Sequence, residues 1–132
     1  MPTGRCHCGA CVYAFDDAPT RASVCHCSDC RRCAGAHGVG WLAVPSGAFR
    51  LVEGEPAVYR SSPGTERYFC SNCGTGLYYI NEEVLPGIVD VQIGTLDDPD
   101  AFPPAALIQL ADAPAWVATL HTLPKFERFP GG

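Results

Sequence analysis

Short stretches rich in aromatic and β-branched residues recur along the chain. Most alternate apolar and polar positions or are too short for a helix, which is typical of β-strands. The predicted strands cover residues 11–15, 39–44, 49–53, 57–61, 67–70, 76–80 and 88–94. Turn sequences such as SSPGT, LPG and LDDPD separate them at short intervals. The pattern predicts an all-β domain of short, mostly antiparallel strands.

Helical patterns are weak by comparison. The sequence DCRRCAGAH at residues 29–37 predicts one or two helical turns, and PAALIQL at residues 104–110 is ambiguous between helix and strand. The C-terminal LPKFERFPGG, residues 123–132, is rich in Pro and Gly, so we expect it to lie on the surface or to fray. No linker or low-complexity break divides the chain, and we expect one domain over residues 1–132.

Composition and charge narrow the class of protein. With 132 residues, 14 Gly and 12 Pro, the chain has room for one modest core and little room for long helices. A net charge of −5 disfavours nucleic acid as a partner, because a phosphate backbone would be repelled. The sequence lacks a signal peptide and a long apolar run, so we expect no membrane span and a cytoplasmic location.

Nine cysteines change this picture most. The cytoplasm keeps thiols reduced, so cysteines two or three residues apart are better explained as metal ligands or reactive groups than as disulfides. An odd number also leaves at least one thiol unpaired. A secreted disulfide scaffold is the alternative, and both observations disfavour it.

Two cysteine pairs far apart in sequence have the spacing of a structural zinc site. They occur in CHCG at residues 6–9 and CSNCG at residues 70–74. Zinc takes four thiolates tetrahedrally, and two such pairs complete a closed site. Gly9 and Gly74 directly follow the pairs, where a tight turn around an ion often needs a positive φ. We predict a structural zinc, which contributes to folding, on Cys6, Cys8, Cys70 and Cys73.

A third cluster, CHCSDCRRC at residues 25–33, has a different character. Cys25, Cys27 and Cys30 supply three thiolates, and a zinc with three protein ligands keeps a fourth position for water or substrate. Three thiolates give the Zn²⁺ site a formal charge of about −1, which suits binding a thiol better than making hydroxide. We predict an open second zinc site, beside Arg31 and Arg32, which either meet substrate carboxylates or lie in solvent.

Two residues offer a fourth ligand that would close this second site. Cys33 continues the spacing after Cys30, and His37 lies four residues further on. Both alternatives stay open here, and either would make the cluster structural. An iron–sulfur cluster is disfavoured, because a histidine stands where the ferredoxin motif has its last cysteine. His7 and His26 lie between ligand cysteines, and we expect both to point away from the metal.

The order of these cysteines resembles that of the glutathione-dependent formaldehyde-activating enzymes, which share their domain with centromere protein V. The similarity runs through GRCHCGACVYAF, CHCSDCRR, ERYFCSNCGTGLYY and VDVQIGTLDDPDAF to PAW at residues 114–116. It therefore covers nearly the whole chain. The resemblance implies an Mss4-like all-β zinc-binding fold and two zinc ions per chain, on the same two ligand sets that the spacing selects.

The resemblance also implies a function. The reaction for which this family is named joins glutathione and formaldehyde into S-(hydroxymethyl)glutathione. It is the reverse of a carbon–sulfur lyase reaction. We expect the thiol to bind at the open position of the second zinc, lose its proton and attack the aldehyde. Arg31 and Arg67 are candidates for pairing with the carboxylates of glutathione. The alternative is a non-catalytic zinc module that binds glutathione or a protein partner, which a closed second site would favour.

Overall fold

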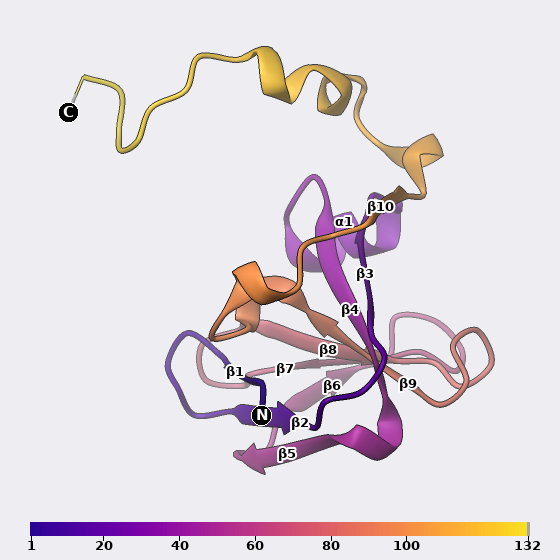
Figure 1. The fold of residues 1–132 in the computed structure, drawn as a ribbon. Helices are drawn as coiled ribbons and strands as arrows, with labels where there is room; N and C mark the ends of the chain where they lie inside the picture. Colours follow the sequence, from indigo (N-terminus) through magenta and orange to yellow (C-terminus); the bar gives the residue numbers. More distant parts are fainter. Residues whose placement is uncertain (132) are drawn as a thin grey trace.

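The computed structural model describes residues 1–131 and contains two β-sheets, one short α-helix and several 3-10 helices (Figure 1). The smaller sheet is antiparallel, in the order β1-β2-β5. Its strands are β1 (Thr3–Arg5), β2 (Val12–Phe15) and β5 (Phe49–Glu53). The larger sheet has the order β10-β3-β4-β9-β8-β7-β6.

The larger sheet is antiparallel except for β10, which runs parallel to β3. Its strands are β3 (Arg21–Cys25), β4 (Val39–Pro45), β6 (Ala57–Tyr59), β7 (Glu66–Phe69), β8 (Gly76–Ile80), β9 (Ile88–Gln92) and β10 (Ala106–Ile108). The helices are α1 (Ser28–Ala34), η1 (Ser46–Ala48), η2 (Ile93–Thr95), η3 (Pro99–Ala101), η4 (Leu110–Asp112) and η5 (Ala115–Thr122). The prediction of an all-β, mostly antiparallel fold is confirmed.

The alternation of side chains along β4 separates two apolar clusters. Leu42 and Val44 belong to the main core, where side chains of β2 in the small sheet meet those of β4, β8 and β9 in the large sheet. Val39 and Trp41 point to the opposite face and form a second cluster with cysteines of β3 and α1. One face of the large sheet therefore holds the fold together, and the other carries the second cysteine cluster.

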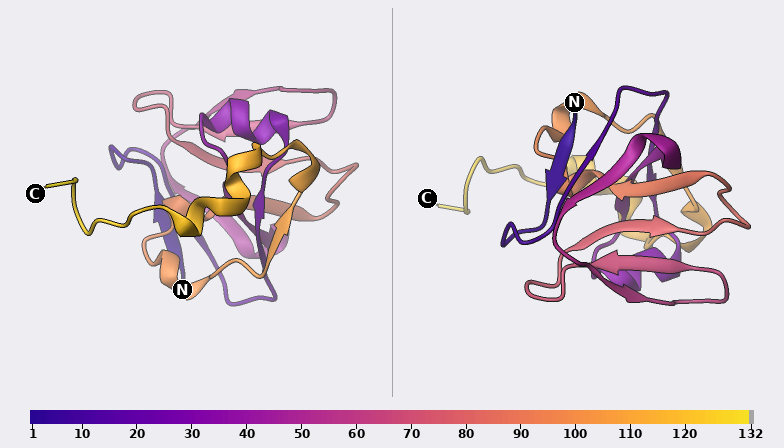
Figure 2. Two further views of the ribbon diagram at one scale, coloured as in Figure 1. Left: turned by 90° about the horizontal axis from the view of Figure 1, so that it is seen from above. Right: turned by 90° about the horizontal axis from the view of Figure 1, so that it is seen from below.

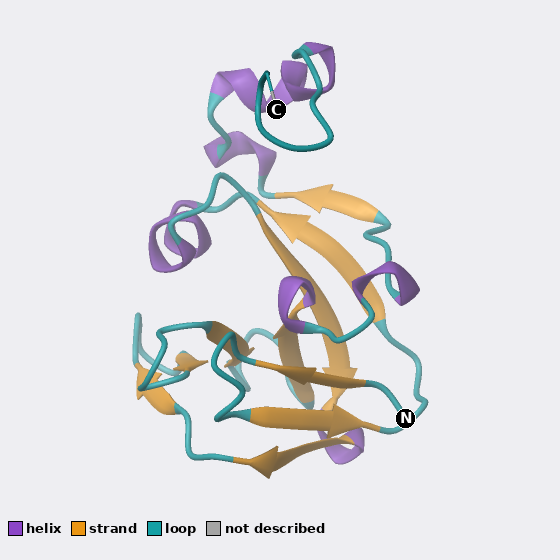
Figure 3. Cartoon of the chain, turned by 90° about the vertical axis from the view of Figure 1, so that its left-hand side faces the viewer, coloured by secondary structure: helices purple, strands orange, loops and turns teal. Residues whose placement is uncertain are grey.

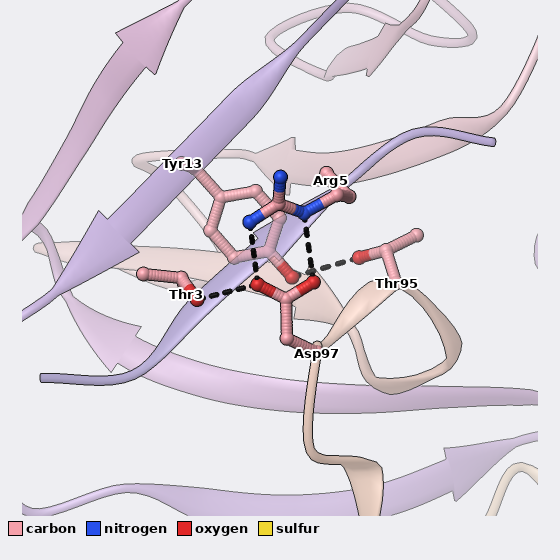
Figure 4. A network of polar contacts seen from close by, with 5 residues as sticks. All are labelled: Thr3, Arg5, Tyr13, Thr95 and Asp97. Carbon is pink, nitrogen blue, oxygen red and sulfur yellow. Dashed lines mark hydrogen bonds and ion pairs between the residues drawn. The ribbon is translucent and has the colours of Figure 1, made fainter. Parts of the chain in front are cut away.

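A polar network ties the first strand to the segment after β9 (Figure 4). The Arg5 guanidinium donates two hydrogen bonds of 2.9 Å to the carboxylate of Asp97, which also accepts one from the hydroxyl of Thr3. Beside it, the hydroxyl oxygens of Tyr13 and Thr95 are 2.7 Å apart. Because Arg5 directly precedes Cys6, this network fixes the start of the first cysteine pair.

The chain beyond β10 leaves the two sheets. It passes over the end of the large sheet that carries α1 and then runs away from the body, as Figures 1 and 2 show and Figure 3 confirms from the side. Residues 123–131 are all exposed, which confirms the predicted surface position for that part of the C-terminal sequence. Gly132, the last residue of that prediction, lies outside the described residues.

The predicted strands are all present, with ends that differ by at most two residues. The helix predicted at residues 29–37 is α1, and the ambiguous residues 104–110 contain β10 followed by the start of η4. The strands β1 and β3 and the 3-10 helices η1, η2, η3 and η5 were not predicted. Among the described residues, the helices are all too short or too polar to cross a membrane.

Candidate metal centres and the adjoining pocket

The four cysteines predicted to hold a structural zinc come together at the edge of the main core. All four sulfurs lie within 4.8 Å of one another. The Sγ of Cys8 is 3.6 Å from that of Cys6 and 3.7 Å from that of Cys70. Sulfurs held tetrahedrally at about 2.3 Å from zinc are about 3.8 Å apart. The set, which Cys73 completes, therefore fits zinc in donor type, number and spacing.

Glycines shape the turns that present these sulfurs. Gly9 and Gly74 have φ values of 81° and 83°, which confirms the positive φ predicted after each pair. The first turn is also packed closely from outside by Gly54, with a φ of 84°. A Cβ on Gly54 would collide with the carbonyl oxygen of Ala10. The loop after β5 thus holds the first cysteine turn in place.

Hydrogen-bond donors surround the sulfurs of this set. The backbone N–H of Cys11 donates to Cys6 Sγ over 3.3 Å, and the N–H of Cys73 donates to Cys70 Sγ over 3.4 Å. The Thr75 hydroxyl lies 3.2 Å from Cys73 Sγ, and hydrogen bonds from Thr75 lower the pKa of Cys73 to about 5. Donors of this kind favour the thiolate form that zinc binds.

The second set of cysteines forms where β3 leads into α1. Cys25 ends β3, Cys27 caps the N-terminus of α1, and Cys30 lies in the first turn of the helix. The N–H of Cys30 donates to Cys27 Sγ over 3.2 Å, and the three sulfurs lie within 4.8 Å of one another. Burial raises the pKa of the Cys30 thiol, so a thiolate there needs a cation nearby. Three converging sulfurs fit a zinc ion with three protein ligands.

Neither residue considered as a fourth ligand joins this group. Within residues 1–131, the three sulfurs form a group without a further Cys, His, Asp or Glu. Cys33 is exposed on the later part of α1. The ring of His37 instead packs edge-on against Trp116 of η5, with centroids 5.4 Å apart. Of the three cysteines, Cys30 lines the pocket described below.

The two histidines that lie between ligand cysteines also stay outside both groups. His26 is buried, and its Nδ1 lies 3.2 Å from the carbonyl oxygen of Ile108 in β10. His7 is exposed. His26 therefore links the second cysteine set to the edge strand of the sheet instead of adding a ligand.

Arg67 of β7 faces the second cysteine set from across the sheet. Its Nη1 and Nη2 are each 3.9 Å from Cys30 Sγ. The guanidinium is held in place by a 2.9 Å hydrogen bond from Nε to the Ser61 hydroxyl and by the ring of Tyr79, whose centroid is 5.0 Å away. A fixed positive charge at this distance offsets part of the negative charge of three thiolates.

The two arginines of α1 occupy different positions. Arg32 is exposed and lines the pocket described below. Arg31 is partly buried, its Nε lacks a hydrogen-bond partner, and it does not contribute to the pocket wall. A role for Arg31 in binding substrate stays a prediction, and Arg32 has the more direct access to the pocket.

A pocket of about 600 Å³ adjoins Cys30, which forms part of its wall. Small-molecule sites usually measure about 300–1,000 Å³. The pocket also reaches Gly74, beside the first cysteine set, and Gly76, where a Cβ would collide with the Gln92 amide. Half of the remaining wall residues are aromatic, and the others include two arginines and a glutamine: Arg32, Cys33, Ala34, Trp41, Tyr59, Arg67, Tyr68, Phe69, Tyr78 and Gln92.

Most of these wall residues were missed from the sequence. Trp41 and Gln92 are direct partners in the pairing of β4 with β9, so they share the face of the sheet that carries Cys25. The alternation of side chains along each strand was the available signal. This alternation shows which residues of different strands share a face only when the order of the strands in the sheet is known. Local sequence patterns do not give that order.

The fold and the site together define a small all-β protein with one four-sulfur group, one three-sulfur group and a pocket beside the latter. The profile of the family described as glutathione-dependent formaldehyde-activating enzyme matches residues 1–112. The chain belongs to this family.

Two relatives agree with this assignment, and one solved structure shares the fold. A Schizosaccharomyces pombe protein, named as an uncharacterized lyase, is 33% identical over 122 residues, which cover 75% of this chain and 82% of that protein. A Halomonas elongata protein named "Putative glutathione-dependent formaldehyde-activating enzyme" is 30% identical over 124 residues, covering 86% and 78%. A crystal structure of a Rhodobacter sphaeroides protein shares the fold, with a TM-score of 0.64 and 22% identity over 80% of this chain and 98% of that chain. The predicted family is confirmed.

Proposed function

We propose that this protein catalyses the reversible addition of a thiol to a small aldehyde, most simply of glutathione to formaldehyde. The observation that carries the proposal is the three-sulfur group of Cys25, Cys27 and Cys30, without a fourth ligand among residues 1–131, in contact with a pocket. A closed four-ligand group would leave no position for a substrate. The names of the family and of the Halomonas relative point to the same two substrates.

The proposal includes two zinc ions per chain. Cys6, Cys8, Cys70 and Cys73 would hold one as a structural cross-link between distant parts of the chain, and the three-sulfur group would hold the other. A zinc ion in the second group supplies a positive charge that lowers the pKa of a nearby thiol. We also propose a cytoplasmic location, because reducing conditions would keep all nine cysteines as the free thiols seen here.

Three arginines have proposed roles around the pocket. Arg67 keeps the net negative charge of the sulfur group low, because both of its terminal nitrogens face Cys30 Sγ. Arg32, at the pocket wall, pairs with a carboxylate of the incoming glutathione. Arg31, the residue before Arg32, adds positive charge beside it. Arg32 is the first arginine to test, because its side chain is exposed.

The reaction itself needs no oxidant or reductant. The thiol loses its proton, a sulfur lone pair forms the bond to the aldehyde carbon, and the carbonyl π electrons move to oxygen, which takes up a proton. The reverse reaction breaks the carbon–sulfur bond and returns its electron pair to sulfur. The chain contributes by holding thiol and aldehyde together in one pocket, which replaces a bimolecular encounter by a local one.

Exchange between free formaldehyde and its glutathione adduct, followed by NMR, tests the proposal. We expect the protein to accelerate exchange above the protein-free rate, and Cys30→Ser to abolish the acceleration while Cys33→Ser retains it. A rate equal to the protein-free control, with both zinc ions bound, would reject the proposal. If glutathione binds without catalysis, the protein is the non-catalytic zinc module considered above.

A further inference from the structure

The pocket beside Cys30 has an aromatic wall that neither formaldehyde nor glutathione matches in chemical character. Five aromatic residues contribute to its wall. The rings of Tyr68 and Tyr78 pack into the main core on the other face of the sheet, which leaves Trp41, Tyr59 and Phe69 to offer aromatic surface to a ligand. Formaldehyde adds a single hydroxymethyl group to the thiol, and glutathione is a polar peptide without a ring. Aromatic walls contribute to affinity mainly by covering apolar surface. The pocket is therefore built for a ligand with an apolar group.

The aromatic walls are held firmly on the inner side and are accessible at the rim. Trp41 is 5% exposed and packs edge-on against Tyr79, with centroids 5.9 Å apart. By contrast, Tyr59, the last residue of β6, is 56% exposed. A ring entering the pocket would meet fixed walls and be covered by Tyr59.

The charges of the pocket indicate the other half of the ligand. Arg32 and Arg67 line it, and of the described residues that form its wall none is Asp or Glu. Such a wall attracts carboxylates, and it offers no acidic partner to an ammonium group. An anionic thiol carrying an apolar substituent matches both features.

We infer that the preferred substrate is the thiol adduct of an aldehyde with an apolar side group about the size of a phenyl ring. This inference rests on the proposed function and names its substrate class. The side group lies against Trp41 and beneath Tyr59, the reacting carbon lies near Cys30, and the carboxylates of the thiol lie toward Arg32. The bond changes are those given above, with the aldehyde R–CHO in place of formaldehyde.

Stable thioethers of glutathione test this without the reaction. S-methylglutathione matches the size of the formaldehyde adduct, and S-benzylglutathione carries the additional ring. The chain has two tryptophans, so Trp116→Phe leaves Trp41, in the pocket wall, as the single fluorescent reporter of binding. We expect S-benzylglutathione to bind about tenfold more tightly than S-methylglutathione, which corresponds to burying about half of a phenyl ring.

A variant pair on β6 checks that the ring is recognised where we place it. Tyr59→Ala should reduce the preference for S-benzylglutathione over S-methylglutathione to about threefold or less. Val58→Ala, one residue away on the opposite face of the strand, should leave this preference at about tenfold.

Two outcomes would overturn the inference and leave the proposed function standing. One is equal binding of the two thioethers, and the other is failure of both to bind while formaldehyde exchange is catalysed. The exchange assay decides the proposed function separately.

Discussion

Replacement of Arg67 by methionine tests how the second cysteine set tolerates its negative charge. Methionine keeps much of the length of the side chain and removes the guanidinium. At 3.9 Å from Cys30 Sγ, a unit positive charge interacts with a thiolate by about 4 kcal/mol at an effective dielectric constant of about 20. Arg67 is only partly buried, so solvent screening reduces this value, and charged hydrogen bonds typically contribute about 1.5–3 kcal/mol. We therefore expect metal affinity at this set to fall by about 10- to 100-fold.

Competition with a chelator, combined with cobalt substitution, measures this loss. Sulfur-to-cobalt charge-transfer absorption reports how many ions are bound through thiolates, and the four-sulfur set serves as an internal reference in the same molecule. Arg50→Met is the matched control, since Arg50 carries the same charge but pairs with Asp16 on the other sheet. An unchanged affinity in Arg67→Met, or a loss no larger than in Arg50→Met, would refute the argument that Arg67 stabilises the thiolates.

Three further predictions concern stability. Cys73→Ser should prevent stable folding, whereas Cys30→Ser should stay folded and bind one zinc ion fewer. Circular dichroism measures the folding, and metal analysis measures the zinc content. The same outcome for both variants would contradict a structural role for the first cysteine set and a functional role for the second. Gly54→Ala should lower the free energy of unfolding, measured in urea, by about 2 kcal/mol or more, because Gly54 has a positive φ and its new Cβ would collide with the backbone of Ala10. Gly47→Ala is the control, because a Cβ there has no neighbour within 4 Å. Burial raises the pKa of Asp90 to about 6, so ionisation of its carboxyl lowers the free energy of unfolding. The carboxyl is protonated below about pH 4 and has no such effect there, and the loss of stability grows as the pH rises to 6. Asp90→Asn should therefore gain about 1–3 kcal/mol above pH 6 and little at pH 4, and a gain independent of pH would contradict this.

The two ligand sets could be predicted because their geometry is local. In CxC and CxxC sequences, the backbone alone brings two sulfurs within a few ångströms, and a metal needs little more than two such turns. The positive φ of Gly9 and Gly74 follows from the same turn geometry. Which cysteine pairs share one site depends on the fold. Here the spacing and the glycines that follow each pair were sufficient to group the CxC pair at Cys6 with the CxxC pair at Cys70.

The strands that were missed depend on partners far away in sequence. The segment of β3, RASVC, is mixed in polarity, and it becomes a strand because β4 pairs on one side and β10 on the other. The parallel pairing of β10 needs a connection of about 80 residues that no local pattern indicates. The same holds for Arg67, which reaches Cys30 across 37 positions of the chain.

One strand connects stability and chemistry in this protein. Along β4, Leu42 and Val44 fill the main core, whereas Val39 and Trp41 support the cysteine set and the pocket on the other face. The four-sulfur set is attached to the main core through Cys6 and Cys70, so its loss removes a cross-link from the packing that defines the fold. The three-sulfur set belongs to the second, smaller cluster, at the junction of β3 and α1. Its ligands can therefore change with limited effect on the core, and substitutions on this face should alter metal affinity and substrate choice before they alter folding.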